Sequence, residues 1–253
     1  MCGFKGVSAI TADDTVTARS LAHWNGFSAY SSDQGCINPA SQNNDQIFSI
    51  STFKIPPDII RQSFLLTFHK QKWNFQIEGL FSDYGLLKDF ITGSVFSSNS
   101  WLMGIAGKST LFKILSFGLK LNWSGIKIDD WNTSSLAMDA GIRTQLKNGR
   151  AGIGITLKNS GLYKSKNAGH GQQFLILGTY YRPAYFPGVL SLDFDNYSRW
   201  RGIFGLEISP FEKIKLYLSN TTDVLQLHTG SIYQNFISGF GLGIQINWRN
   251  YAL

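Results

Sequence analysis

The chain has 253 residues, enough for one large domain or two small ones, and a formal net charge of +7. Only 15% of its residues are charged, against roughly 25% in ordinary soluble domains, while 14% are aromatic and 26 are glycine. The 23 basic residues stand singly, with no run of five like charges, so we expect no nucleic-acid partner. This composition suits a protein whose outer face meets lipid. The sequence contains no stretch of 18 apolar residues, so it predicts no transmembrane helix.

The first 44 residues differ from the rest because they lack a strand pattern. A helix is expected there only around residues 15–23, and Asn38-Pro39-Ala40 follows as a rigid kink. Proline has a fixed φ and no N–H, and it moves the preceding residue out of the α region. Since Pro39 cannot donate to a β ladder, we expect the kink to lie ahead of the first strand, near Asp45. The side chain of Asn38 is expected to satisfy backbone groups at the kink.

From Asp45 onward, apolar side chains recur at every second residue. The clearest examples are residues 73–79, 115–123, 136–143, 151–158 and 240–248. Successive side chains of a strand point to opposite faces, so each segment has one apolar face and one polar or small face. We expect about 12–14 such strands of roughly eight to twelve residues.

Turn signals separate these segments. Asn148-Gly149 predicts a hairpin with a two-residue primed turn, and Phe186-Pro187-Gly188 and Ser209-Pro210-Phe211 predict further turns. No linker or change of composition divides the chain. We therefore expect one domain over residues 1–253, with an N-terminal segment (1–44) followed by the strands (45–253).

Two features favour a membrane barrel over a soluble β-sandwich, which has the same alternation. The non-apolar face is rich in glycine, which in a strand marks curvature or close backbone approach. The apolar face carries aromatic residues near strand ends, as in the belts at membrane interfaces: Trp73, Phe81, Trp101, Trp123 and Trp248. The sequence thus predicts an all-β fold, a transmembrane antiparallel β-barrel of about 12–14 strands, with a short N-terminal segment at or in the lumen.

The alternation also predicts which polar residues face the lumen: Lys120, Asp139, Arg143, Glu207 and Gln245. Charge pointing inward costs little when it is paired or meets water. These residues either fill a narrow lumen or act as a selectivity filter, and the spacing does not decide between the two.

Several stretches, in this order, resemble one family. They are Thr17-Ala-Arg-Ser-Leu, Gly26-Phe-Ser-Ala-Tyr-Ser-Ser-Asp, Asn38-Pro-Ala, Phe81-Ser-Asp-Tyr-Gly, Phe117-Gly-Leu-Lys-Leu-Asn, Ser134-Ser-Leu-Ala-Met-Asp-Ala-Gly-Ile and Gly154-Ile-Thr-Leu-Lys-Asn-Ser-Gly. The chain, over residues 17–251, resembles the PorV/PorQ family of Bacteroidetes outer-membrane barrels, which is related to the FadL fatty-acid transporters. It departs from that family at His23-Trp24-Asn25, where members usually have Gly-Gly.

The resemblance implies a multi-pass protein of the bacterial outer membrane that belongs to the type IX secretion system and is not an enzyme. Its partners would be outer-membrane lipid, translocon or attachment proteins, and the C-terminal signal domains of cargo. The docking loops would be residues 83–99, 129–134, 164–172 and 220–235.

An enzyme and a channel are the two alternatives to this role. Catalysis needs converging titratable groups, whereas the four histidines lie far apart and no Gly-x-Ser-x-Gly motif is present. Asp129-Asp130 and the Asp193/Asp195 pair have ordinary turn and strand explanations, so we expect no catalytic residues, no metal and no cofactor. The stronger alternative is a FadL-like outer-membrane channel for hydrophobic small molecules, in which the residues before Asn38 plug the lumen.

Overall fold

A computed structural model describes residue 29 and residues 38–42, 46–55, 59–88, 93–111, 114–146, 148–165, 173–196, 200–211, 214–221 and 240–246. They form a short 3-10 helix, η1 (Pro39–Ser41), and twelve strands. The strands are β1 (Ile47–Ile55), β2 (Ile59–Lys70), β3 (Trp73–Lys88), β4 (Val95–Leu111), β5 (Leu115–Ile128), β6 (Trp131–Gln145), β7 (Ala151–Lys164), β8 (Phe174–Tyr181), β9 (Gly188–Asp195), β10 (Arg201–Phe211), β11 (Ile214–Thr221) and β12 (Phe240–Ile246).

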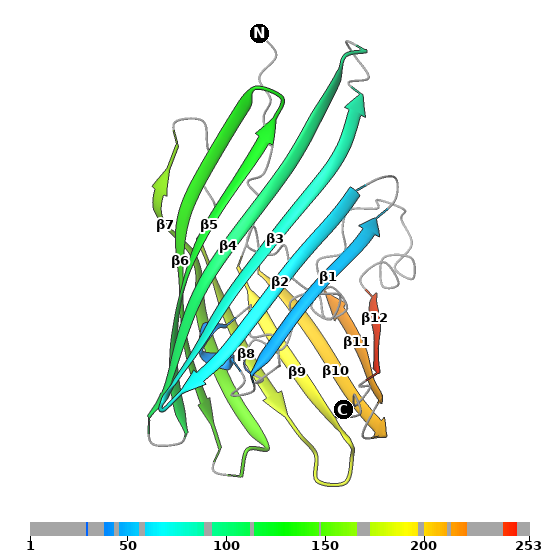
Figure 1. Cartoon of the computed structure of the whole chain (residues 1–253). Helices are drawn as coiled ribbons and strands as arrows, with labels where there is room; N and C mark the ends of the chain where they lie inside the picture. The colour runs from blue at the N-terminus through cyan, green and yellow to red at the C-terminus, as the bar shows by residue number, and fades with distance from the viewer. Residues whose placement is uncertain are drawn as a thin grey trace, which may run out of the picture.

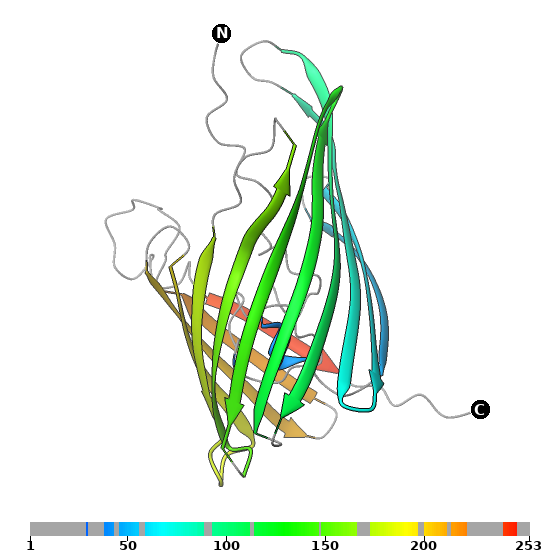
Figure 2. The ribbon, with the colours of Figure 1, turned by 90° about the vertical axis from the view of Figure 1, so that its left-hand side faces the viewer.

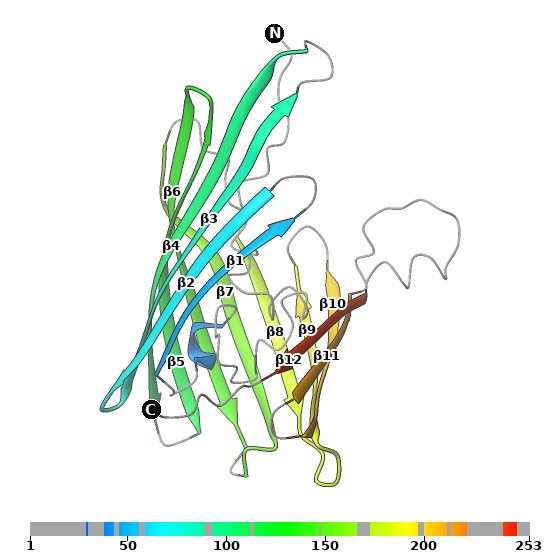
Figure 3. The same ribbon diagram turned by 45° about the vertical axis from the view of Figure 1, so that its right-hand side comes forward.

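The twelve strands belong to one antiparallel sheet in which the spatial order is the chain order, β1 to β12. Figures 1 and 3 show the sheet curling into a barrel of tilted strands, with η1 inside it. Such an up-and-down meander needs only hairpin connections, which suits a chain that alternates strands and short turns. The twelve strands of the described residues lie within the predicted number, but β3 to β7 are longer than the predicted eight to twelve residues. Among the described residues, no helix is long and apolar enough to cross a membrane.

The two faces of the barrel wall are inverted relative to a soluble protein. On β5, Lys120 and Asn122 are buried at 4% and 3% exposure, whereas Leu119 and Trp123 are 57% and 52% exposed. The same alternation recurs on β3, where Gln76 and Glu78 are buried beside the half-buried Phe75 and Ile77. An apolar outer surface of this extent is stable only in contact with lipid. The fold is therefore a transmembrane β-barrel.

The wall is taller on one side than on the other. Strands β3 to β7 have 14 to 17 residues, whereas β8 to β11 have 8 to 11. Figure 2 shows the green strands rising above the yellow and orange ones. On the outer face of this tall side, Phe81 lies opposite Trp101, and two residues further along their strands Asp83 lies opposite Asn99. The polar row continues to Lys127 and Asn132 on β5 and β6. The apolar band thus ends below the top of the tall strands, which project beyond the membrane.

The two longest connections lie at the same end of the barrel. At one end only Gln71 and Lys72 join β2 to β3, and only residues 112–114 join β4 to β5. The opposite end carries the links from β7 to β8 and from β11 to β12, residues 165–173 and 222–239. Short turns mark the periplasmic end of outer-membrane barrels and long loops the extracellular end. By this rule the tall wall projects outside the cell.

Three predictions about turns and loops need correction. The predicted loops 83–99 and 129–134 are mostly strand, because β3 continues to Lys88, β4 begins at Val95 and β6 begins at Trp131, with a register shift between β3 and β4 near Gly85. The predicted two-residue turn at Asn148-Gly149 is longer: Leu146 N–H donates to Ala151 O at 2.8 Å and Gly149 N–H to Leu146 O at 2.7 Å. In this hairpin Gly149 has a positive φ of 68° and Asn148 does not, whereas both primed turn types need a positive φ at the first central residue.

The third correction concerns Ser209-Pro210-Phe211, which was predicted as a turn and instead lies in β10. The β10–β11 register shifts between Ile208 and Phe211. A strand accommodates proline at such an irregularity because the ladder there does not need its N–H. Phe186-Pro187 does lie in the turn before β9, as predicted. The helix expected around residues 15–23, and Asp45 at the start of the first strand, lie outside the described residues.

Candidate functional site: the lumen and its N-terminal segment

The Asn-Pro-Ala motif forms the 3-10 turn η1 inside the barrel, packed against β4, β5 and β6. Asn38 caps the turn in an extended conformation (φ −110°, ψ 112°), as expected for a residue before proline. Its Oδ1 accepts from the Ala40 N–H at 2.9 Å, and its Nδ2 donates to Ile142 O of the wall at 3.4 Å. Pro39 fills the first helical position, where no N–H is needed. The side chain of Asn38 therefore satisfies the turn and ties it to β6.

Glycines in three neighbouring strands make room for this turn. A Cβ added to Gly118 of β5 would lie 2.2 Å from the Pro39 carbonyl carbon. One added to Gly141 of β6 would lie 2.0 Å from Asn38 Oδ1, and one added to Gly154 of β7 would lie 3.0 Å from Ala29 Cα. Gly118 and Gly141 are direct partners in the β5–β6 ladder. The glycine on the inner face thus marks the close backbone approach that the sequence pattern suggested.

Two wall cations hold the N-terminal segment through its main chain. Lys108 of β4 donates from Nζ to the carbonyl oxygen of Gln42. Arg143 of β6 donates from Nε to the Ala29 carbonyl oxygen at 2.6 Å, and its guanidinium lies 5.7 Å from the Tyr180 ring centroid. Ala29 is fully buried in an apolar cluster with Tyr180 and Val189. The segment therefore contacts both the β4–β7 wall and the β8–β9 wall of the lumen.

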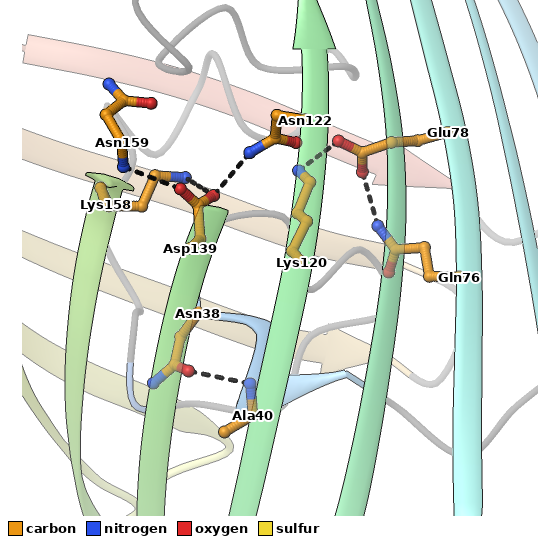
Figure 4. A network of polar contacts seen from close by, with 9 residues as sticks. All are labelled: Asn38, Ala40, Gln76, Glu78, Lys120, Asn122, Asp139, Lys158 and Asn159. Atoms are coloured by element: carbon orange, nitrogen blue, oxygen red, sulfur yellow. Dashed lines mark hydrogen bonds and ion pairs between the residues drawn. The ribbon is translucent and has the colours of Figure 1, made fainter. Parts of the chain in front are cut away.

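Next to this turn, the inner face of β3 to β5 carries one half of a polar network (Figure 4). Lys120 Nζ forms an ion pair with Glu78 Oε1, and Gln76 Nε2 donates to Glu78 Oε2 at 2.6 Å. All three residues are buried. Gly104 lies between the two strands, and a Cβ there would meet Glu78 Cγ and Lys120 Cε at 2.9 Å each. A missing side chain on β4 thus allows the ion pair to span β3 and β5.

The other half of the network is centred on Asp139 of β6, which is 0% exposed. Its Oδ2 pairs with Lys158 Nζ at 3.1 Å and accepts from Asn122 Nδ2 at 2.9 Å. Its Oδ1 accepts from the Asn159 N–H at 2.9 Å, because β7 bulges there and Asn159 takes a positive φ of 57°. A carboxylate with three such donors is well compensated for its loss of water. The wall of the lumen is therefore filled by paired charge.

The shorter wall has its own ion pairs. Glu207 of β10 pairs with Lys215 of β11 at 3.3 Å, and Asp195 of β9 pairs with Arg201 of β10 at 2.6 Å. Both basic partners are partly exposed, with side-chain exposures of 25% and 20%. These pairs keep access to water, which the Asp139 group lacks.

The predicted lumen residues fall as follows. Lys120, Asp139, Arg143 and Glu207 are all buried, at 4%, 0%, 7% and 3% exposure. Lys120 and Asp139 come together across the β5–β6 ladder, as partners in register, while Arg143 and Glu207 lie apart from them. Gln245 is in β12 opposite Lys215, and its side chain lies outside the described residues.

The predicted set of lumen residues leaves out other inward-facing charged residues, among them Glu78, Lys108, Lys158, Asp193 and Asp195. The alternation that placed Lys120 inward also placed Glu78, since the apolar residues Phe75 and Ile77 flank it. The hydrogen bond from Lys108 to Gln42 joins residues 66 positions apart, so no local sequence pattern indicates it.

The two acidic pairs lie where the sequence predicts them, Asp129-Asp130 in a turn and Asp193 with Asp195 in a strand. Asp129 Oδ1 accepts from the Ser97 N–H at 2.9 Å in the β5–β6 turn. Asp193 and Asp195 are alternate buried residues of β9. Within the described ranges, no group of three or more His, Cys, Asp or Glu side chains could hold a metal ion.

The lipid-facing apolar exterior, polar interior and antiparallel meander define an outer-membrane-type β-barrel with an N-terminal segment in its lumen. Neither a protein-family model nor a curated protein sequence matches the chain. Among solved structures, it is similar to the KdgM porin, with 8% identity and a TM-score of 0.42 over 75% of this chain and 93% of the porin. It is also similar to outer membrane phospholipase A from Escherichia coli, with 14% identity and a TM-score of 0.40 over 75% and 81% of the two chains. The assignment to this class rests on the chain's own faces and topology.

Proposed function

We propose that this protein is a non-enzymatic barrel of the type IX secretion or attachment machinery, which docks partner proteins on its extracellular side. The resemblance of residues 17–251 to the PorV/PorQ family suggests this role. One observation supports docking over passage: the lumen is lined by paired charges and holds the Asn38–Ser41 turn against its wall. Because these contacts fill the lumen, the extracellular rim of the barrel is the surface that remains for binding partner proteins.

The tall β3–β7 wall is the docking surface that this proposal favours. At the tip of the β3–β4 hairpin, Leu86 is 78% exposed and Val95 58% exposed, beyond the polar row that starts at Asp83. Exposed apolar residues outside the membrane band are typical of protein contacts. The partners would be translocon or attachment proteins and the C-terminal signal domains of cargo.

The proposal is tested by co-purifying the full-length protein from outer membranes after mild cross-linking and identifying its partners by mass spectrometry. Leu86→Lys should reduce recovery of a secretion partner without changing the amount of barrel. Tyr185→Lys is the matched control, since Tyr185 is 102% exposed in the β8–β9 turn at the opposite end. Recovery of no secretion-system protein with the unmodified chain would refute the proposal.

A FadL-like channel for hydrophobic small molecules is the second candidate. The observation in its favour is that β8 and β10 turn apolar side chains into the lumen, with Phe174, Ile176 and Ile203 each at most 4% exposed. Uptake of a hydrophobic dye into vesicles that contain the purified barrel, above that of empty vesicles, would favour this function.

A further inference from the structure

The inward-facing cations of the wall differ in their partners. Lys120, Lys158, Arg201 and Lys215 each pair with a carboxylate: Glu78, Asp139, Asp195 and Glu207 in turn. Among the residues that the structure describes, Lys108 and Arg143 have no carboxylate partner. Their acceptors among the described residues are the main-chain oxygens of Gln42 and Ala29, with the Tyr180 hydroxyl 3.4 Å from Arg143 Nη2.

These two cations are buried, at 4% and 7% exposure, so water screens them little. A carbonyl dipole compensates a buried cation less completely than a carboxylate does. The wall therefore has a local excess of positive charge at the place where the N-terminal segment docks.

Their spacing suits a shared ligand. Lys108 lies opposite Gly118, which lies opposite Gly141, and Arg143 follows Gly141 by two residues on the same face. The two backbones lie two strands apart, about 10 Å, and two residues apart along the strand, about 7 Å, which gives a separation of about 12 Å that the long side chains of lysine and arginine can bridge. Gln42 adds an independent observation: its side chain is 1% exposed, and neither its Nε2 nor its Oε1 has a hydrogen-bond partner in the described part of the chain.

We infer that Lys108 and Arg143 form an anion-binding site on the lumen wall, which the N-terminal segment covers with its own carbonyl oxygens. The ligand class is a small anion that carries a phosphate or carboxylate group. Displacing the segment exposes two charged donors that a full negative charge satisfies better than the carbonyl groups do. This site is independent of the proposed secretion role.

The experiment first displaces the turn and then titrates the site. In Gly141→Val the new side chain starts 2.0 Å from Asn38 Oδ1, and in Gly118→Val 2.2 Å from the Pro39 carbonyl carbon, so each excludes the turn. Binding of inorganic phosphate to each full-length variant in detergent micelles is measured by isothermal titration calorimetry. We expect tighter binding than to the unmodified protein.

Adding Lys108→Gln and Arg143→Gln to either glycine variant should weaken phosphate binding at least about tenfold, because two charged donors are lost. Glu78→Gln with Lys120→Gln is the matched control, since it removes a neighbouring ion pair without changing the net charge of the lumen. Binding should survive in this control. Absence of phosphate binding in both glycine variants, or binding that is unchanged by the Lys108 and Arg143 substitutions, overturns the inference.

Discussion

The two sides of the lumen are built differently. The inner face of β4 to β7 combines glycines with long charged side chains, and its central carboxylate, Asp139, is fully buried with three donors. The inner face of β8 to β11 carries bulky apolar side chains such as Phe174 and Tyr217 together with carboxylates whose basic partners reach water. The first wall receives the N-terminal turn through its glycines, and the second contacts Ala29 through Tyr180 and Val189.

This difference shows how one strand pattern serves two purposes. Period-two alternation determines only which residues point into the lumen, and it leaves their size and charge open. Where the segment packs against the wall, the inward residue must be small or must bind its main chain, as Gly118 and Lys108 do. Elsewhere large side chains fill the space. Four predictions follow, from the largest expected effect to the smallest, three on this division of the lumen and one on the outer face.

Replacing Asp139 by alanine should cause the greatest loss of stability. It removes the carboxylate that pairs with Lys158, which is 2% exposed, and removing one partner of a buried ion pair costs about 3–5 kcal/mol. The free energy of unfolding from lipid vesicles, followed by tryptophan fluorescence in urea, measures this loss. Glu207→Ala on the opposite wall is the control. Because Lys215 is 25% exposed and can be hydrated, its loss should be clearly smaller. Equal losses would show that the two walls do not differ in this respect.

The outer face should follow one rule, set by depth in the bilayer. Leu119 is 57% exposed on the outer face, away from either end of β5. Leu119→Arg places a charge there and should lower the free energy of unfolding by about 2–4 kcal/mol. Leu111→Arg is the control, because Leu111 is the last residue of β4 and charge near the interface costs about 0–1 kcal/mol. Folding yield and unfolding free energy in vesicles measure both. An inward-facing variant such as Lys120→Glu would not serve as a control for Leu119→Arg, because it places a second carboxylate beside Glu78.

The glycine cradle gives a third test. In Gly141→Ala the added methyl carbon would lie 2.0 Å from Asn38 Oδ1, and such overpacking costs about 1–3 kcal/mol. Gly161→Ala in the neighbouring strand β7 is the matched control, because a Cβ there meets nothing within 4 Å. The same unfolding measurement should give a loss for the first variant and little change for the second. A similar loss in both would mean that strand flexibility, and not the turn, explains the glycine.

The sequence predicted the barrel and its faces well because both follow from a local rule. Alternation around Leu119 fixes which side chains meet lipid, whatever the strand's partners are. The local properties of proline and asparagine likewise predicted that Asn38 and Pro39 lie ahead of the first strand and that the Asn38 side chain bonds to backbone groups at the kink.

The sequence could not predict what depends on distant contacts. The Arg143–Ala29 hydrogen bond joins residues 114 positions apart, and the hydrogen bond from the Asn159 N–H to Asp139 depends on a bulge in β7. The turn predicted at Ser209-Pro210-Phe211 was wrong for a related reason. Pro210 lies within β10 because the β10–β11 register is irregular there, and no local sequence pattern indicates this irregularity.

The smallest effect is expected at Asn38, and it separates the two bonds of its side chain. Asn38→Ala removes the acceptor of the Ala40 N–H and the donor to Ile142 O, and loss of such a cap typically costs about 1 kcal/mol. Asn38→Ser keeps a hydroxyl acceptor for the turn but cannot reach as far as the amide nitrogen does, so it should recover most of that stability. Unfolding free energies of the two variants make this comparison. If serine restores nothing, the bond from Nδ2 to β6 is the important one, and the turn is held by the wall more than by its own cap.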